Sequence, residues 1–382
     1  MRYTPFYALG LFLTVAPTTL GFEDSNNHYL RGLGHKHRSK RGTGGGTGVN
    51  VDIDINASTD PHGSTGPYKP TGPPGPTDYP RWKLTDNFCG DGFYDHFTFE
   101  AITDPTHGRV NYVDMQTAKA KNLTEVTKAG NFIMRADSTT VLDPTGPGRD
   151  SIRIQSKKQW TTGVSVLDLN HMPEGCGTWP AYWMTQVENW PVNGEVDILE
   201  GVHDQPPNHS ALHTVDGCLV APTRTMTGSV VATNCSWLHN YNQGCPVQWD
   251  RQDSYGPPLN KMGAGWFVTE RTEKRISIWF WGRHDSNVPP AVKNGLPTIS
   301  TKDFGIPVAT WDSSDECKFE KIMGLQNIII NLTFCGDWAG QDPIFKAAGC
   351  PGTCIDYVNN NPASFKNAYW DIASLKVYSK AL

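Results

Sequence analysis

The sequence predicts an all-β protein, an antiparallel β-sandwich, from three observations. Its 382 residues include 38 glycines and 28 prolines, and only 19% of them are charged. Such a composition favours many short strands joined by turns over a helical protein. Short segments with alternating or continuous apolar side chains recur between turn residues, and none carries a helical period of useful length. The length allows one large or two average domains.

The N-terminal quarter predicts three segments ahead of the folded domain. Residues 1–21 combine Arg2, an apolar run and small residues, which is typical of a secretory signal peptide too short to span a bilayer. Residues 22–41 are basic and end at a dibasic site, so we interpret them as a candidate propeptide, with a solvated tail or a weak polyanion-binding patch as alternatives. Residues 42–80 are rich in Gly, Pro and Thr, which indicates a linker or disordered arm. The folded domain is expected at 81–382.

Within that domain, alternating segments between turn residues predict the strands. The first expected strand, residues 93–99, is followed by the turn Asp104-Pro-Thr-His-Gly108. Residues 216–263 form a long loop region with three cysteines, and a loop of that length is usually functional or tied by disulfides. The expected strands are residues 93–99, 132–136, 151–155, 164–169, 211–214, 276–281, 326–334 and 367–378.

Charge and cysteine usage restrict the partners and the compartment. A net charge of −5 argues against a nucleic-acid partner, which requires a basic face. No later segment is apolar for long enough to cross a bilayer, and the C-terminus lacks a hydrophobic tail, so we expect no membrane partner. Nine dispersed cysteines imply disulfides with one thiol left over, in a secreted, extracellular or cell-wall protein. Their pairing cannot be deduced from their positions.

The candidate site is the segment Glu195-Val-Asp-Ile-Leu-Glu200, which places three carboxylates within six residues. On a regular strand Glu195 and Asp197 share one face, whereas Glu200 points the other way. One extra residue after Asp197, a β-bulge formed by Ile198 or Leu199, brings all three acids onto one face. Three convergent carboxylates repel one another unless one stays protonated, as a glycosidase acid/base pair requires. The alternative is a solvated edge strand.

Several tryptophans precede these acids, and their faces suit the C–H faces of sugar rings. The motifs Cys176-Gly-Thr-Trp-Pro-Ala-Tyr-Trp-Met184 and Trp190-Pro-Val-Asn-Gly-Glu-Val-Asp-Ile-Leu-Glu200 resemble glycoside hydrolase family 16, most closely the fungal endo-1,3(4)-β-glucanases or laminarinases. The resemblance spans about residues 82–380 and implies a concanavalin A-like jelly roll with a concave sugar-binding cleft. The Glu-x-Asp-x-x-Glu spacing resembles laminarinases, whereas lichenases lack the extra residue.

The resemblance also implies roles for the three acids. Glu195 corresponds to the nucleophile, Glu200 to the acid/base, and Asp197 to a residue that hydrogen-bonds the nucleophile and helps keep a proton on the site. We expect anionic neighbours to raise the pKa of Glu200. Strand spacing alone leaves open both the retaining separation of about 5–5.5 Å and the inverting separation of about 6.5–9.5 Å. The resemblance favours retention.

Six further residues are expected to bind the sugar chain. Trp183 and Trp190 match tryptophans on the glycone side of the family's cleft, and His213 matches a histidine on the strand after the acids. For these three, core packing or a structural histidine is the alternative. The other candidates for sugar subsites are Trp237, Trp266 and Arg283. No metal or cofactor is expected, because no ligand motif is found.

These observations lead to three hypotheses. The first is a secreted, endo-acting β-glucanase that hydrolyses β-1,3 and mixed β-1,3/1,4 glucans with retention. The second is a cell-wall transglycosylase, and the third is a non-catalytic β-glucan-binding lectin, although lectins of this kind have lost catalytic glutamates. The expected partner is a β-glucan polysaccharide, and the protein is expected to be a monomer. Candidate N-glycosylation sequons begin at Asn56, Asn122, Asn208, Asn234 and Asn331.

Overall fold

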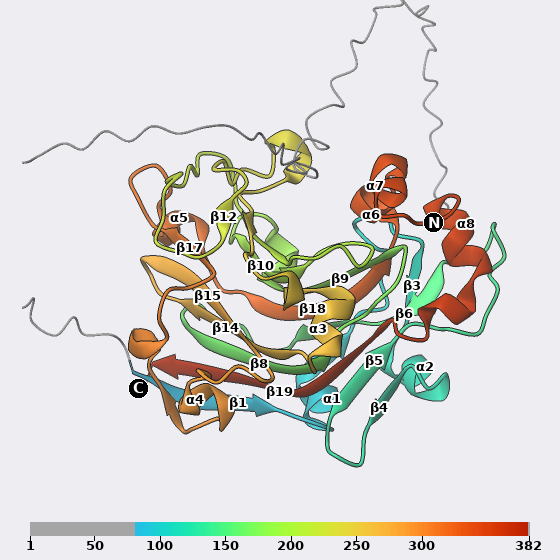
Figure 1. Cartoon of the computed structure of the whole chain (residues 1–382), viewed down its shortest axis with the longest axis horizontal. Helices are drawn as coiled ribbons and strands as arrows, with labels where there is room; N and C mark the ends of the chain where they lie inside the picture. The colour runs from blue at the N-terminus through green and yellow to red at the C-terminus, as the bar shows by residue number, and fades with distance from the viewer. Residues whose placement is uncertain (1–80, 381–382) are drawn as a thin grey trace, which may run out of the picture. The chain divides into compact units, whose positions relative to one another are not determined.

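A computed structural model describes residues 81–380, and it confirms the predicted antiparallel β-sandwich. The segments expected at 1–21, 22–41 and 42–80 lie outside the described residues. Two sheets of nine and eight strands are stacked, and Figure 1 shows β9, β10 and β18 lying over β8, β14 and β19. All strand pairs within these two sheets are antiparallel, whereas the short pair of β3 and β6 is parallel.

The nine-stranded sheet has the order β16-β1-β19-β8-β14-β15-β17, with β5 also on β19 and β4 on β5. Its strands are β1 (Trp82–Phe88), β4 (Thr124–Val126), β5 (Phe132–Arg135), β8 (Gly163–His171), β14 (Gly265–Arg271), β15 (Arg275–Gly282), β16 (Thr298–Ile299), β17 (Ala309–Asp312) and β19 (Tyr369–Lys380).

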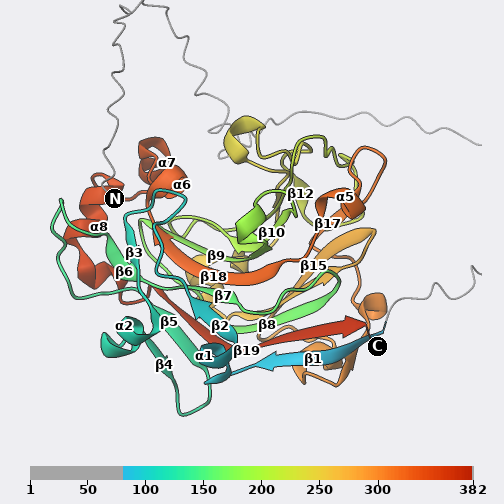
Figure 2. The ribbon, with the colours of Figure 1, turned by 180° about the vertical axis from the view of Figure 1, so that it is seen from behind.

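The eight-stranded sheet has the order β12-β13-β11-β10-β9-β18-β7-β2, and seen from behind β7 and β2 continue it beyond β18 (Figure 2). Its strands are β2 (Phe97–Phe99), β7 (Arg153–Ser156), β9 (Thr178–Thr185), β10 (Glu195–Glu200), β11 (His209–His213), β12 (Ser229–Val230), β13 (Val247–Gln248) and β18 (Asn327–Phe334), while β3 (Val110–Tyr112) and β6 (Arg149–Ser151) form the separate pair.

Short helices lie in the connections. The α-helices are α1 (Gly92–His96), α2 (Met115–Ala120), α3 (Gly256–Lys261), α4 (Pro290–Lys293), α5 (Phe319–Ile322), α6 (Gly336–Ala339), α7 (Asp342–Ala347) and α8 (Cys354–Asn360). The 3-10 turns are η2 (Val187–Asn189), η3 (Asn240–Asn242), η4 (Gln252–Ser254), η5 (Thr301–Asp303) and η6 (Pro362–Phe365). No helix within residues 81–380 is both long enough and apolar enough to cross a membrane.

The main core lies between the two sheets and follows the alternation of their strands. Leu167 and Phe267 from the nine-stranded sheet meet Tyr182 and Val196 from the eight-stranded sheet, and each of these side chains is at most 1% exposed. Burial of each such side chain contributes about 1.5–3 kcal/mol to folding. Because neighbouring residues of a strand point to opposite faces, the remaining side chains of β10 point away from this core.

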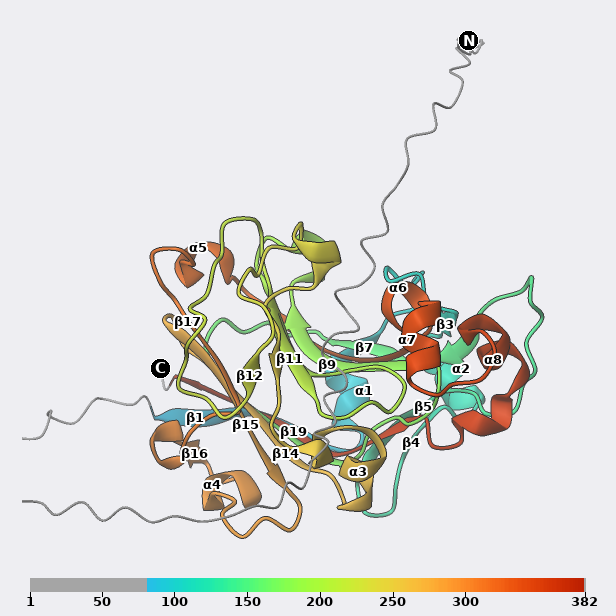
Figure 3. The same cartoon turned by 45° about the horizontal axis from the view of Figure 1, so that its top comes forward.

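The polar face of the eight-stranded sheet is flanked at both ends by connecting segments. Figure 3 shows α6, α7 and α8 at one end, and the region of β12 and its neighbouring loops at the other. The disulfides Cys235–Cys245 and Cys218–Cys317 tie the long loop region, as expected for its length. The helical end is tied by Cys176–Cys350 and Cys335–Cys354. Four disulfides and the single free thiol of Cys89 confirm the predicted cysteine usage.

The strand predicted at residues 93–99 is wrong in its first four residues, which are helical. The segment 93–99 begins in α1 and only its last three residues form β2. Phe93 and Phe97 are four residues apart and both are fully buried, so they satisfy a helical spacing as well as an alternating one. Of the strands that were not predicted, β9 and β14 matter most, because each supplies a candidate sugar-binding tryptophan.

Candidate active site

The site is built on β10, which lies between β9 and β11 in the eight-stranded sheet. Asp197 pairs with Trp183 on β9, but the next pair is Leu199 with Tyr182, so Ile198 is the extra residue. The predicted bulge is therefore confirmed. The side chains of Val196, Ile198 and Leu199 are at most 1% exposed in the core, and the three acids occupy the opposite face.

At the N-terminal end of β10, the carboxylate of Glu195 is held by a tryptophan. The indole Nε1–H of Trp190 donates a hydrogen bond of 2.8 Å to Glu195 Oε2. Trp190 packs edge-to-face against Trp237, whose ring centre lies 5.5 Å away and whose side chain is 38% exposed. These contacts place two aromatic side chains beside Glu195, the second of which belongs to the long loop region.

Asp197, in the middle of the strand, is paired with a histidine. His213 on β11 lies opposite Glu195 in the register, and its Nε2 is 3.2 Å from Asp197 Oδ2. The other ring nitrogen, Nδ1, contacts Asn242 Oδ1 at 2.9 Å. Burial alone would lower the pKa of His213, but the hydrogen bond and charge of Asp197 outweigh it and raise that pKa to about 10. The contact with Asp197 therefore favours the protonated imidazole of His213.

The sequence suggested that Asp197 hydrogen-bonds the nucleophile, and this stays a prediction. In residues 81–380 the charged contact of Asp197 is with His213. The donor atoms of Glu195, Asp197 and His213 lie within 4.8 Å of one another, a spacing that would also suit a metal ion. Two of the three groups, Asp197 and His213, form the ion pair described above.

At the C-terminal end of β10, a second indole holds Glu200. Trp179 on β9 donates from Nε1 to Glu200 Oε1 at 2.8 Å. Trp179 also packs edge-to-face against Trp338 of α6, with 5.6 Å between the ring centres. The two glutamates therefore have matching environments, each with one indole donor and a further tryptophan from one of the flanking regions.

Both glutamates have a raised pKa, and their charged surroundings differ in one respect. Burial, followed by the charge of Asp197, raises the pKa of both Glu195 and Glu200. His213 lowers both pKa values, whereas Arg153 acts on Glu195 alone, and an ionised Glu195 further raises the pKa of Glu200. The positive charge of Arg153 favours ionisation of Glu195 over Glu200, while the pKa of each carboxyl is raised to about 8.

Trp183 completes the aromatic surface around the acids. Its Nε1–H donates to Asn331 Oδ1 at 2.7 Å, and the Asn331 amide contacts the Tyr112 hydroxyl at 3.3 Å. The guanidinium of Arg153 lies 5.1 Å from the ring centre of Trp183. Asn331 is only 6% exposed and serves as a partner of Trp183, although in the sequence it was a candidate glycosylation site.

The structure brings Trp183, Trp190, His213 and Trp237 together around the acids, but it does not bring Trp266 and Arg283 there. Trp266 lies on β14 of the nine-stranded sheet, is 4% exposed, and belongs to a core cluster separate from the one between the sheets. The guanidinium of Arg283 covers its ring at 4.2 Å and pairs with Asp168 at 2.7 Å. The prediction of sugar subsites at these two residues is therefore wrong.

Sequence reasoning missed two functional contacts. Trp179 was recognised only as one of several tryptophans near the acids, and its indole hydrogen bond to Glu200 follows from strand pairing that no local pattern reveals. Trp338 stands alone in a helical turn, so no signal in the sequence connects it with a site about 140 positions earlier. Tyr112 on β3 also reaches this region, because its hydroxyl accepts a hydrogen bond from the Asn331 amide.

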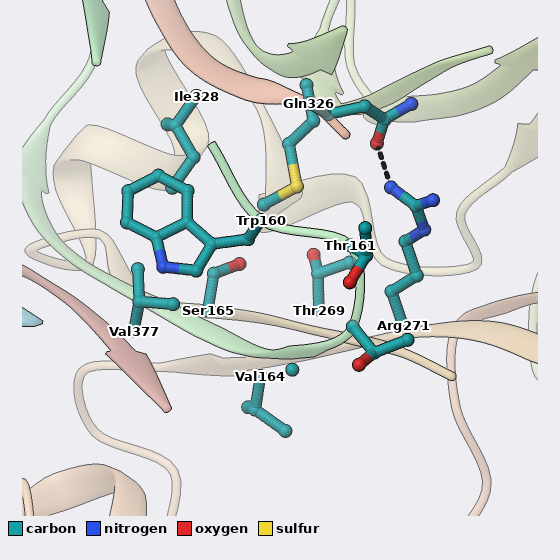
Figure 4. Close-up of a pocket in the computed structure, with 12 residues that line it drawn as sticks. Trp160, Thr161, Val164, Ser165, Thr269, Arg271, Gln326, Ile328 and Val377 are labelled. Atoms are coloured by element: carbon teal, nitrogen blue, oxygen red, sulfur yellow. Dashed lines mark hydrogen bonds between the residues drawn. The ribbon is translucent and has the colours of Figure 1, made fainter. Parts of the chain in front are cut away.

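A cavity elsewhere in the molecule is not part of this site. It has a volume of about 30 Å³ and is lined by side chains that include Trp160, Arg271, Gln326 and Ile328 (Figure 4). Such a volume suits a single water molecule and is far too small for a sugar ring.

A β-sandwich that carries two indole-bound carboxyls on one strand face suits a glycoside hydrolase, which needs a pair of catalytic carboxyls. Residues 97–378 match the family model described as "XgeA-like, catalytic GH16 domain". The chain belongs to this family, glycoside hydrolase family 16.

Two curated relatives and two solved structures agree with this assignment. A probable endo-1,3(4)-beta-glucanase from Aspergillus clavatus is 40% identical over 306 residues, which are 78% of this chain and 46% of that protein. A probable glycosidase from Schizosaccharomyces pombe is 42% identical over 301 residues, covering 78% of this chain and 69% of that protein. The chain thus spans about half the length of the Aspergillus relative.

The solved structures are similar over the whole of their own chains. Laminarinase 16A from Phanerochaete chrysosporium was solved with two β-glucans in its donor and acceptor sites. It is 53% identical, the match covers 78% of this chain and 100% of that one, and the TM-score is 0.77. An elongating family 16 β-1,3-glucosyltransferase has 35% identity with the same coverage and a TM-score of 0.72.

Proposed function

We propose that this protein is a secreted, endo-acting β-glucanase that cleaves β-1,3 and mixed β-1,3/1,4 glucans with retention of anomeric configuration. The observation that carries the proposal is the arrangement on β10, where Glu195 and Glu200 share one face and each accepts an indole hydrogen bond. The ion pair of Asp197 and His213 lies between them. Four disulfides support the proposed secretion.

In the first step Glu195 is ionised and attacks the anomeric carbon. The glycosidic bond breaks, and the proton of Glu200 passes to the departing sugar oxygen. The products are a covalent glycosyl-enzyme on Glu195 and a shortened glucan with a free hydroxyl group. The charges of His213 and Arg153 oppose the rise in the pKa of Glu195, and Arg153 does so for Glu195 alone, which favours Glu195 as the ionised group and Glu200 as the proton donor.

In the second step the roles of Glu200 reverse. Its carboxylate takes a proton from water, the water oxygen attacks the anomeric carbon, and Glu195 leaves as a carboxylate. Two inversions at the same carbon give net retention. Glu200 regains the proton that it lost in the first step, so the enzyme returns to its starting state.

The proposed substrate rests on the relatives and on the aromatic surface. The Aspergillus relative is named a probable endo-1,3(4)-beta-glucanase, and the laminarinase structure holds β-glucans in both its donor and acceptor sites. In this chain, tryptophans lie on both sides of the acids, with Trp190 and Trp237 at one end and Trp179 and Trp338 at the other. Binding on both sides of the cleaved bond suits attack within a chain.

Transglycosylation is the second candidate, and one observation favours it. The elongating β-1,3-glucosyltransferase shares the fold at a TM-score of 0.72 and 35% identity. Transfer uses the same glycosyl-enzyme and replaces water by a sugar hydroxyl, so residues beside Glu200 decide the outcome. A non-catalytic lectin has less support, because both glutamates and their indole donors are present.

The test measures reducing ends released from laminarin and from lichenan, with the sizes of the products. We expect release from both polymers, early appearance of mid-sized products, and loss of activity by at least about 1,000-fold in Glu195→Gln. Transfer would yield products longer than the starting oligosaccharide. Binding without release by the wild type would contradict catalysis, and full activity of Glu195→Gln would contradict the nucleophile.

A further inference from the structure

The bulge that turns Glu200 toward the other acids leaves part of β10 without a regular strand partner. On β11, Ala211 pairs with Asp197 and His209 pairs with Glu200, so Ile198 and Leu199 together oppose only Ser210. Both residues between the acids are fully buried. Buried backbone N–H and C=O groups need partners, so something other than the strand ladder must supply them here.

Two side chains of the neighbouring strand region supply these partners. The Oδ1 atom of Asn208 accepts the backbone N–H of Glu200 at 3.0 Å, and its Nδ2 donates to the carbonyl of Ile198 at 2.8 Å. Ser210 Oγ donates to the same carbonyl at 2.7 Å. The two acceptor positions of that carbonyl are thus filled, and one amide spans the bulge from its extra residue to Glu200.

Asn208 is itself rigidly held. Its side chain is completely buried, its backbone N–H donates to Ser254 Oγ at 3.0 Å, and its carbonyl accepts from the Trp249 N–H at 3.0 Å. The indole of Trp249 donates to Ser210 Oγ at 3.0 Å. The side chains of Asn208 and Ser210 are therefore anchored in the segment of η4 and β13, outside the catalytic strand.

We propose that Asn208 and Ser210 are positioning residues that fix the bulge and thereby aim the carboxyl of Glu200. The proposal rests on the proposed function, because it requires Glu200 to be the acid/base. In the sequence these residues form the sequon Asn208-His-Ser. With its amide buried and hydrogen-bonded at both ends, Asn208 serves the bulge and is not accessible for glycosylation.

The experiment compares two substrates that differ in their need for an acid. Laminarin requires protonation of the leaving oxygen, whereas a 2,4-dinitrophenyl β-laminaribioside releases its phenolate without it. Asn208→Ala should lower kcat/KM for laminarin by about 100-fold, and for the aryl glycoside by less than about 5-fold. Glu200→Gln should give the same pattern and serves as the reference.

Sodium azide supplies a second readout. Azide needs no general base, so it attacks the anomeric carbon directly, forms a C–N bond and displaces the Glu195 carboxylate. If Glu200 is misplaced, azide should raise kcat of Asn208→Ala on the aryl glycoside and yield the β-glycosyl azide. The wild type should show neither effect, because its own base already activates water.

Two further variants keep the test decisive. Ser210→Ala leaves Asn208 in place and should cause a smaller selective loss on laminarin, about 10-fold. Asn359→Ala removes another buried asparagine, which lies on α8 and accepts from Arg109 at 2.8 Å through its Oδ1, and should keep the wild-type ratio of the two activities. The ratio does not depend on the folded fraction, because both substrates report on the same active molecules.

Equal losses on both substrates, or no azide effect, in Asn208→Ala would overturn the proposal and leave a purely structural role. A wild-type enzyme that cleaves neither substrate would instead overturn the proposed function, and this inference with it.

Discussion

Replacement of Trp179 or Trp190 by phenylalanine should shift the pKa of one catalytic carboxyl at a time, and the pH–rate profile shows which one. Each substitution keeps an aromatic ring but removes one indole N–H, which donates at 2.8 Å to Glu200 or to Glu195 respectively. A hydrogen bond donated to a carboxylate stabilises its ionised form, so its removal raises the pKa of that group. The two variants therefore act on different limbs of the pH–rate profile and serve as controls for each other.

The size of the effect follows from the strength of such a hydrogen bond. A hydrogen bond to an ionised acceptor contributes about 1.5–3 kcal/mol. Part of this is not lost in the variant, because water can replace the indole donor and because the bond also stabilises the protonated acid to some extent. A net loss of about 1 kcal/mol moves a pKa by about 0.7, because one pKa unit corresponds to about 1.36 kcal/mol. A displacement of that size is measurable in kcat/KM recorded at close pH intervals.

The direction differs between the two variants. Glu195 must be ionised to attack, so a higher pKa in Trp190→Phe moves the acidic limb upward and reduces activity at low pH. Glu200 must be protonated to donate, so a higher pKa in Trp179→Phe moves the basic limb upward and extends activity to higher pH. Weaker sugar stacking lowers kcat/KM at every pH but does not move a limb.

The assay is initial-rate hydrolysis of a soluble laminari-oligosaccharide at constant ionic strength. If Trp190→Phe moved the basic limb and Trp179→Phe the acidic one, the roles of Glu195 and Glu200 would be reversed. If neither limb moved in either variant, the indole hydrogen bonds would not set these pKa values, and the electrostatic argument would fail.

The remaining predictions concern the bulge, the corrected subsites and the sequons. Deletion of Ile198 restores simple alternation and turns Glu200 toward the core, so hydrolysis of laminarin should fall by at least about 100-fold, whereas unchanged activity would show that the bulge does not matter. Arg283→Ala should leave kcat/KM for laminarin unchanged while lowering the free energy of unfolding by about 1 kcal/mol, measured by urea denaturation; a selective rise in KM would restore its subsite role. Glycopeptide mapping of the secreted protein should find glycan at exposed Asn122 and none at Asn331, whose amide is buried beneath Trp183.

The acids and the bulge were predictable because the evidence for them is local. Six consecutive residues determine which side chains share a face, and only an extra residue reconciles Glu200 with Glu195 and Asp197. The core residues Val196, Ile198 and Leu199 then follow from the same parity. The resemblance of the surrounding motif supplied the roles that the spacing alone left open.

The misassigned residues show where local reasoning ends. Trp266 and Arg283 lie close to aromatic segments, but a local pattern does not reveal which of the two sheets a segment joins. In the structure β14 pairs with β8 and β15, so Trp266 lies on the nine-stranded sheet and Arg283 lies in the turn directly after β15. Non-local strand pairing also explains why the donor from Trp179 to Glu200 was missed.

Asn208 and Asn331 show the same limit for polar residues. As sequons they suggested surface modification, because the three-residue pattern carries no information about burial. In the fold both side chains are buried. The amide of Asn208 hydrogen-bonds the bulge, and the amide of Asn331 accepts a hydrogen bond from Trp183. A polar residue inside a predicted strand of a two-sheet protein is thus as consistent with a site partner as with a surface position.

The central claim is a covalent intermediate on Glu195, and trapping it is the most direct test. A 2-deoxy-2-fluoro β-laminaribiosyl fluoride forms the glycosyl-enzyme but slows its hydrolysis, so the labelled protein can be digested and sequenced by mass spectrometry. We predict one sugar label per molecule, carried by Glu195, and no label in Glu195→Gln. A label on Glu200 or Asp197, or rapid turnover to the inverted product with no label, would contradict the mechanism.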